Sequence, residues 1–282
     1  MNFQKMTELT SITDSGKVNV WFRFLLFINS LFPIIVSFIM TAALTEEEAL
    51  DYEYSTLFGL QTENYAHVID FFLFMVYNIY LLVLPYFISI LYTFLCIYLC
   101  MMIDYSIRSL RKSEGNDYNI ESNFRLISEV FHFINKLEHS LSLCIFFVMA
   151  LNLMLSFTSF AYFLGYYERN SSATSGIIAW FTGNVASFVA VVWWASKVNS
   201  KSTNLRRAFL STISCSMRKT SDDSKYFLLM YFKCMQFDNI HLTGWQMFNF
   251  SREIILHAGG TILTYGLLIL QTRITEDSSE TR

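Results

Sequence analysis

The feature that most constrains the fold of this chain is an uncharged stretch near its C-terminal end, from Ile254 to Thr272. It holds roughly 19 residues, about the length that one helix needs to cross the hydrocarbon core of a bilayer. Ala258, Gly259 and Gly260 are consecutive within it, and small residues let membrane helices approach one another closely. We therefore expect residues 253–272 to form a transmembrane helix whose small residues permit close packing.

Polar residues near the end of this helix leave two interpretations open. Thr264, Tyr265 and Gln271 should face protein or water rather than lipid. The helix is then either a tightly packed interior span or a span that lines a water-filled path.

The composition extends the membrane interpretation to the whole chain. Of its 282 residues, 54% are hydrophobic and 17% aromatic, only 15% are charged, and there are two prolines and ten glycines. Such a composition favours a helical membrane protein over soluble domains. The net charge of −3 indicates no nucleic-acid partner, and membrane lipids are the expected surroundings. The predicted fold class is all-α: one polytopic transmembrane domain over residues 1–282.

The distribution of Lys and Arg sets the predicted orientation. Residues 45–66 contain neither, so we place them outside, whereas basic residues follow the fourth apolar run from Lys197 to Lys219, which we place in the cytosol. Asn170 begins an Asn-Ser-Ser acceptor for N-glycosylation in a short loop that we place outside. About five transmembrane helices result, with the N-terminus inside and the C-terminus outside. The predicted spans are 20–44, 68–103, 141–166, 176–195 and 253–272.

The second apolar run allows two interpretations. At 1.5 Å per residue, residues 68–103 are roughly 54 Å long as a helix, which is well over one bilayer core. The run is either one long helix bent at Pro85 or a hairpin that turns there. We favour the long helix, because residues 82–87 include no polar turn residue. A hairpin would also place Arg108 and Arg111 outside.

Two segments are predicted to be cytosolic helices. In residues 118–138, apolar side chains step by four and three residues, a stripe suited to packing against another helix. Residues 221–238 are expected to form an amphipathic helix before the last span, and we expect no regular structure in the acidic tail after residue 272. The stripe consists of Ile120, Phe124, Ile127, Phe131 and Ile134.

A short motif in the last span resembles a known family. Thr264-Tyr265, five mostly apolar residues and Gln271 are similar to the C-terminal signature of arthropod gustatory receptors, which is Thr-Tyr, five apolar residues and Gln-Phe. This chain departs from the signature with Thr272 in place of the Phe. The resemblance implies seven spans with the same orientation of both ends. The chain then resembles a receptor that lacks its first two helices, through a divergent gene or a partial gene model.

The resemblance also implies a function, that of a ligand-gated non-selective cation channel for small organic tastants in the plasma membrane. Four subunits, forming a homo- or heterotetramer with other gustatory receptors, would surround a pore lined by the last helix of each. Leu268, Gln271 and Thr272 would then face the pore near its gate. Thr264 and Tyr265 would hold the helix against its neighbours.

The ligand pocket that the resemblance implies lies among the outer halves of the membrane helices. Aromatic walls with a few polar groups suit a small organic ligand. The candidate ligand-binding residues are Tyr77, Asn78, Tyr80, Ser156, Ser159, Tyr162, Trp180, Thr182 and Asn184.

Other classes of membrane protein fit the sequence less well. Transporters often show repeated halves and charges at mid-membrane, and we find neither a repeat nor a buried charge pair. A membrane enzyme such as a desaturase needs clustered histidines, whereas the five here are scattered, so we expect no enzyme, no metal and no cofactor. A G-protein-coupled receptor requires the opposite orientation. A transporter-like protein or a non-functional partial receptor remains the alternative.

Overall fold

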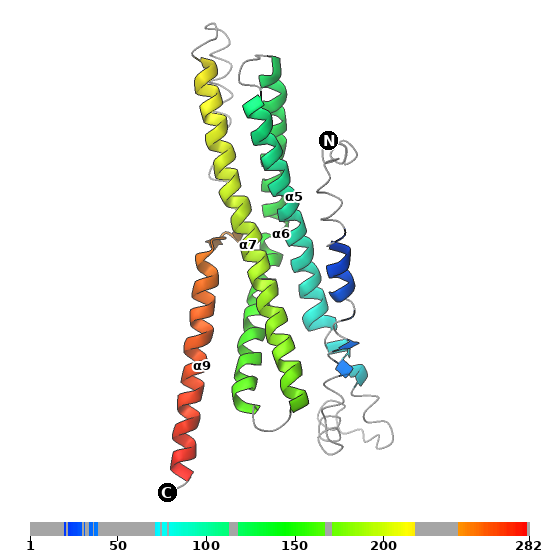
Figure 1. Ribbon diagram of the computed structural model, residues 1–282, viewed down its shortest axis with the longest axis vertical. Coiled ribbons are helices and arrows are strands. Elements are labelled where there is room, and N and C mark those ends of the chain that lie inside the picture. Colours follow the sequence, from blue (N-terminus) through cyan, green and yellow to red (C-terminus); the bar gives the residue numbers. More distant parts are fainter. Residues whose placement is uncertain are drawn as a thin grey trace. The chain divides into compact units, whose positions relative to one another are not determined.

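The computed structural model describes residues 20, 22–29, 31, 34, 35, 37, 38, 71–73, 75–77, 79–112, 118–166, 171–217 and 242–280. Almost all of them are helical, and Figure 1 shows the long helices as continuous coils. The elements are a π-helix η1 (Ile79–Val83), the α-helices α5 (Leu84–Lys112), α6 (Tyr118–Tyr166), α7 (Ser171–Met217) and α9 (Glu253–Glu280), and the strands β1 (Thr243–Gly244) and β2 (Phe248–Asn249).

Four helical stretches among the described residues are long and apolar enough to cross a membrane. Helical residues at 22–29 belong to a fifth apolar run, predicted to span residues 20–44. Many large apolar side chains on these helices are exposed, and lipid tails can cover them. The chain is therefore an all-α multi-pass membrane protein, as its composition predicts. The four stretches are Phe71–Arg111, Arg125–Leu164, Gly176–Thr212 and Glu253–Thr272.

The chain divides into two compact units. Unit 1 comprises Met1–Leu91, Ala150–Phe188 and Ala258–Arg282, and unit 2 comprises Tyr92–Met149 and Val189–His257. Helices α5, α6, α7 and α9 each contribute residues to both units. The predicted ligand and pore residues belong to unit 1, and the β-strands belong to unit 2.

Pro85 alters its helix without reversing the chain. Phe71–Arg111 is one helical stretch of 41 residues, so the chain does not turn back on itself at the proline. Proline lacks an N–H group and its ring crowds the carbonyl four residues earlier. The helix accommodates this locally, because the five residues of η1 directly before Leu84 adopt a wider π-helical turn. Within unit 1, the Asn29 side chain donates a hydrogen bond to the Val83 carbonyl oxygen at 3.3 Å.

Helices α6 and α7 extend well beyond the predicted spans, with 49 and 47 residues. Residues 118–138 and 141–166 therefore form one helix. Helix α9 continues to Glu280, so the expectation of an irregular acidic tail was wrong. Extending an existing helix needs no new nucleus, which favours its continuation into polar sequence. The predicted helix at 221–238 and Asn170 lie outside the described residues.

The core of unit 2 forms where α5, α6 and α7 pack together. Each helix buries a stripe with steps of three and four residues, the spacing of one helical face. Ile127, Phe131 and Ile134 of the predicted stripe are 0%, 8% and 1% exposed, which confirms that it is a packing face. The stripes also include Cys96, Leu99 and Ile103 on α5 and Val191, Ala195, Val198 and Leu205 on α7.

Candidate functional site

Helices α6 and α7 pack against each other in unit 1 through two well-defined contacts. The Asn152 side-chain amide donates a hydrogen bond to the Ser187 hydroxyl at 3.0 Å. The rings of Phe160 and Phe181 stack with their centroids 5.7 Å apart. The residue number rises on α6 as it falls on α7 between these contacts, so the two helices are antiparallel.

Polar side chains lie along and between these two contacts on both helices. On each helix they occur at i, i+4 and i+7, the spacing of one helical face. Asn152, Ser156 and Asn184 are 0%, 1% and 0% exposed. We call this set the polar seam: Asn152, Ser156 and Ser159 on α6, and Trp180, Asn184 and Ser187 on α7.

The polar seam is only partly satisfied by hydrogen bonds. The Ser156 hydroxyl donates to the Asn152 carbonyl oxygen at 2.7 Å, and the Asn184 amide donates to the Trp180 carbonyl oxygen at 2.9 Å. Three buried atoms have no hydrogen-bond partner among the described residues: Oδ1 of Asn152, Oδ1 of Asn184 and Nε1 of Trp180. Leaving such a group buried and unpaired costs about 1–3 kcal/mol. The seam therefore offers two acceptors and one donor to a small polar partner or to water.

Aromatic rings lie beside the polar seam. The Trp180 ring stacks on that of Tyr77, with centroids 6.2 Å apart and an interplanar angle of 23°. Gly183, one turn further along α7, lets Tyr86 approach, because a β-carbon there would lie 2.6 Å from the Tyr86 hydroxyl oxygen. An apolar wall next to a few polar groups is the general form of a small-molecule site.

The structure does not bring all the predicted ligand residues together. Tyr80 and Tyr162 are 69% and 52% exposed, and Thr182 is exposed and donates a hydrogen bond within its own helix. Asn78 lies outside the described residues. The predicted residues in or beside the seam are Tyr77, Ser156, Ser159, Trp180 and Asn184.

Asn152 and Ser187 were missed by the sequence analysis, although they form the hydrogen bond that joins the two helices. The repeated polar spacing of i, i+4 and i+7 on both helices is the signal that finds them. Residue type alone does not, because polar residues also occur on the other faces.

Helix α9 packs on α6 through one side within unit 1. Gly266 is buried, and a β-carbon at this position would overlap the Phe160 ring. The Tyr265 ring meets Phe157 edge to face, with centroids 5.9 Å apart. Ile262, one turn before Gly266, is 9% exposed. These residues form the packing face of α9.

The sequence predicts a close approach to a neighbouring helix at the consecutive small residues 258–260, but α9 makes this approach elsewhere. A β-carbon at Gly259 or Gly260 would meet no atom within 4 Å. Gly266 makes the close contact instead, because it alone of the described α9 glycines faces a ring of α6. The close packing expected at the consecutive small residues is thus absent at Gly259 and Gly260, and α9 makes its close contact about two turns further along the helix.

The predicted pore residues lie on a different side of α9. With about 3.6 residues per turn, Thr264, Leu268 and Gln271 are roughly opposite Gly266. All three are exposed, Leu268 by 49%, and Thr272 beside them is exposed as well. The Thr264 hydroxyl donates to its own helix, to the Gly260 carbonyl oxygen at 2.9 Å. We call this side of α9 the open face.

A β-hairpin, residues 242–250, leads directly into α9 and is held by Asn199 of α7. Strands β1 and β2 pair antiparallel in unit 2. The buried Asn199 amide donates to the carbonyl oxygens of Leu242 and Phe250 at 3.0 and 3.2 Å. Its Oδ1 accepts from the Leu242 N–H at 2.7 Å. One side chain therefore joins both ends of the hairpin to α7.

Glu138 of α6 holds the hairpin from a second helix. Its carboxylate accepts hydrogen bonds from the backbone N–H of Thr243, at 2.9 Å, and from the Thr243 hydroxyl. Hydrogen bonds to a charged acceptor are about twice as strong as neutral ones. The hairpin is thus attached to α6 by a charged group and to α7 by an amide.

The tip of the hairpin has a conformation that side chains rarely adopt. Trp245 and Gln246 have φ values of 51° and 58°, in a turn closed by a hydrogen bond from the Met247 N–H to the Gly244 carbonyl oxygen. A bulky residue there costs about 1–3 kcal/mol unless its surroundings stabilise it. Packing stabilises this turn, because the ring centroids of Trp245 and Phe146 are 5.7 Å apart.

The described residues offer organic functional groups rather than an ion site. Within the described ranges, no group of three or more His, Cys, Asp or Glu could hold a metal ion. Cys96 and Cys100 are buried free thiols. The polar seam itself presents hydroxyls, amides and one indole N–H.

Comparison with known proteins finds a likeness that concerns the fold of the chain. No protein-family model matches the sequence, and no curated protein matches it. Among solved structures, the chain is similar to the insect olfactory receptor OR5 from Machilis hrabei, with a TM-score of 0.64 at 14% sequence identity. The alignment covers 91% of this chain and 67% of that one. At this identity the likeness concerns the fold alone.

Proposed function

We propose that the chain is a subunit of a chemoreceptor channel, a ligand-gated cation channel of the gustatory-receptor kind in the plasma membrane. The observation that carries this proposal is the fold that 91% of the chain shares with an insect olfactory receptor. The Thr-Tyr and Gln motif of α9 is the reason for proposing the gustatory type. The proposed ligand is a small organic tastant.

Helix α9 is proposed to line the pore of a homo- or heterotetramer. Its open face carries polar side chains beside Leu268 and is exposed in the single chain, and a rotationally symmetric assembly could turn this face toward a common axis. Leu268 would then form an apolar constriction, and such a ring can gate by dewetting. Gln271 and Thr272 would form polar rings on its outer side.

The proposed orientation places residues 197–245 in the cytosol. Two tryptophans near the end of the fourth span lie under basic side chains: Lys197 over Trp194 and Arg252 over Trp193, each 4.5 Å from the ring centroid. Tryptophan is enriched at membrane interfaces, and Lys and Arg in cytosolic segments. Both features support an N-terminus inside and a C-terminus outside.

The polar seam is proposed to bind the ligand. Its unpaired acceptors on Asn152 and Asn184 and its unpaired Trp180 donor are buried beside aromatic rings. A primary amide on an apolar body has the two N–H donors and the carbonyl acceptor that these atoms need, whereas a hydroxyl could satisfy only one acceptor and the donor. Binding of such a group would remove the desolvation cost of the atoms it satisfies.

Whole-cell current tests both parts of the proposal. The full chain is expressed alone and together with an insect chemoreceptor subunit, and a panel of small organic alcohols, amides and sugars is applied. At least one compound is expected to evoke a cation current. Asn184→Leu should weaken that response roughly tenfold, because it removes a hydrogen-bond acceptor from the seam.

The control is Thr182→Val, which changes an exposed residue two positions away and should leave the response unchanged. If surface-expressed protein carries no current under any condition, the channel assignment is wrong. If Asn184→Leu and Thr182→Val respond equally, the ligand binds elsewhere.

A further inference from the structure

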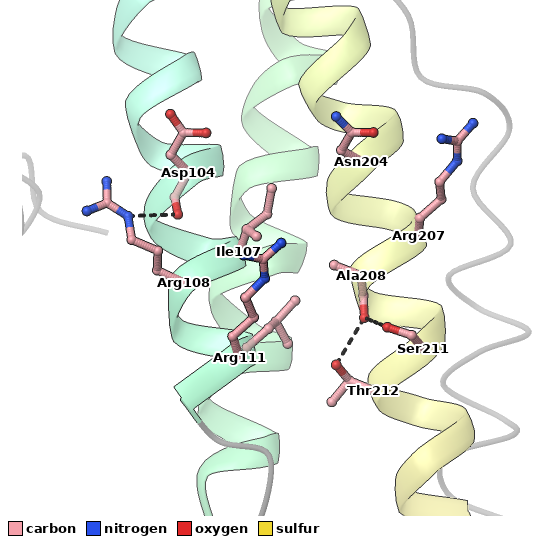
Figure 2. Close-up of a pocket in the computed structure, with 10 residues that line it drawn as sticks. Asp104, Ile107, Arg108, Arg111, Asn204, Arg207, Ala208, Ser211 and Thr212 are labelled. Atoms are coloured by element: carbon pink, nitrogen blue, oxygen red, sulfur yellow. Dashed lines mark hydrogen bonds between the residues drawn. The ribbon is translucent and has the colours of Figure 1, made fainter.

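Helices α5 and α7 border a groove in unit 2, beyond the ends of their apolar runs. Its volume is about 720 Å³. Figure 2 shows its lining side chains arising from successive turns of both helices. We call it the basic groove, and its charged and amide lining residues are Asp104, Arg108, Arg111, Asn204 and Arg207.

The basic groove carries an excess of positive charge. Arg108 and Arg111 come from α5 and Arg207 from α7. Asp104 is the acidic residue among the lining side chains, and its carboxylate forms an ion pair with Lys201. The acid is therefore already neutralised. Among the residues that the structure describes, neither Arg111 nor Arg207 forms an ion pair.

The arginines present their guanidinium groups from two helices. In Figure 2 the Arg111 guanidinium lies between the two helices, and the Arg108 and Arg207 side chains extend to either side of it. Arg108 Nε donates to the Asp104 carbonyl oxygen at 3.4 Å, which leaves its terminal nitrogens for another acceptor. Guanidinium forks bind phosphate through paired hydrogen bonds, which a single ammonium cannot do. The alternative is that these arginines are an ordinary basic helix end in contact with water. Such an end would not require a cavity, or arginines from two helices.

The position of the groove limits its ligand. Along the axis of α5, Arg108 lies about 8 Å beyond Ile103, where the apolar run ends. Along the axis of α7, Arg207 lies about 18 Å beyond Ala195, where the predicted span ends. The polar headgroup layer extends roughly 5–8 Å beyond the hydrocarbon core. The groove therefore reaches from the headgroup layer into the aqueous phase, where phosphates on an inositol ring project.

We propose that the basic groove binds a compact anion with several phosphate groups. This chemistry is shared by the headgroup of a polyphosphorylated lipid and by a free inositol phosphate, and basic pockets at helix ends recognise such groups. The volume of about 720 Å³ is within the range of small-ligand sites. The site is separate from the polar seam, and binding is measurable whether or not the chain conducts.

Titration of the full chain with inositol trisphosphate, in nanodiscs of neutral lipid, tests the proposal by calorimetry. Arg111→Gln and Arg207→Gln should each weaken binding roughly tenfold or more, because each removes a charge-assisted pair. The matched control is Arg125→Gln, which removes an exposed unit 2 arginine outside the groove and should change affinity less than about twofold. Asp104→Asn releases Lys201 and should strengthen binding.

A second experiment distinguishes a lipid headgroup from a free inositol phosphate as the source of the phosphates. Nanodiscs with phosphatidylinositol bisphosphate are compared with phosphatidylserine nanodiscs of equal charge, and thermal stabilisation is measured. Stabilisation by the bisphosphate alone, lost in Arg111→Gln, supports a lipid headgroup. Binding of the soluble trisphosphate, lost in the same variant, supports a free phosphate compound. The proposal is overturned if neither probe binds, or if Arg125→Gln weakens binding as much as Arg111→Gln.

Discussion

Asn199→Leu is expected to lower the free energy of unfolding by about 2–5 kcal/mol. The Asn199 side chain makes three hydrogen bonds to the hairpin, to Leu242 and Phe250. Both residues are buried, at 1% and 3% exposure. Leucine keeps a similar width but leaves the Leu242 N–H and the Phe250 carbonyl oxygen unpaired. The hairpin should then detach from α7.

Thermal unfolding of the purified full chain measures this effect. Asn204→Leu is the matched control, because Asn204 lies on the same helix but is exposed. We expect a clear fall in the melting temperature for Asn199→Leu and almost none for Asn204→Leu. Equal shifts in both variants would mean that the three hydrogen bonds contribute nothing beyond helix propensity.

Gly266→Leu is expected to separate α9 from α6. A β-carbon at Gly266 would overlap the Phe160 ring, which is itself stacked on Phe181 and has little freedom to yield. Overpacking of this kind typically costs about 1–3 kcal/mol. The loss should exceed the gain of about 1 kcal/mol in helix propensity that replacing glycine brings.

Gly260→Leu measures the effect of helix propensity on stability without a change in packing. A β-carbon there meets nothing within 4 Å, so this variant should be neutral or slightly more stable. A short bifunctional thiol reagent that links cysteines introduced at Phe157 and Tyr265, whose ring centroids are 5.9 Å apart, reports the helix contact directly. Crosslinking should fail with Gly266→Leu and persist with Gly260→Leu. Persistence in both variants would show that α9 does not pack on α6 through Gly266.

The helices could be predicted from the sequence because their signals are local. Uncharged runs long enough to cross a bilayer identify the spans, and the stripe through Ile127, Phe131 and Ile134 identifies a packing face. The π-helical turn before Pro85 follows from the chemistry of proline, but only the structure shows that the helix continues past it.

The hairpin could not be predicted because what stabilises it is distant in sequence. Asn199 and Leu242 are 43 positions apart, and Glu138 and Thr243 are 105 apart. The turn also lacks the usual signal, since Trp245 and Gln246 occupy positions that Asn or Gly normally fill. Tertiary contacts with α6 and α7 override the local preference.

The candidate ligand residues were predicted from residue type and from depth in the membrane. The direction in which each side chain leaves its helix decides which of them reach the polar seam. Trp180, Asn184 and Ser187 share one face of α7. Thr182 has a similar polar group at a similar depth, but it lies on roughly the opposite face and is exposed. Applying the helical period to the polar residues would have included Asn152 and Ser187 and excluded Thr182.

The central claim is that the open face of α9 lines a cation pathway while its packing face contacts α6. Cysteine accessibility separates these two faces most directly. Single cysteines are introduced at Leu268, Gln271 and Ile262 in a background free of the five native cysteines. A positively charged methanethiosulfonate reagent is applied from outside while cation current is recorded.

We expect rapid modification and loss of current at Leu268 and Gln271, since both are exposed on the open face. Ile262, which is 9% exposed, should react slowly or not at all. Modification at Ile262 as fast as at Leu268, or current that is unaffected by modification at both Leu268 and Gln271, would contradict the assignment of α9 as the pore helix.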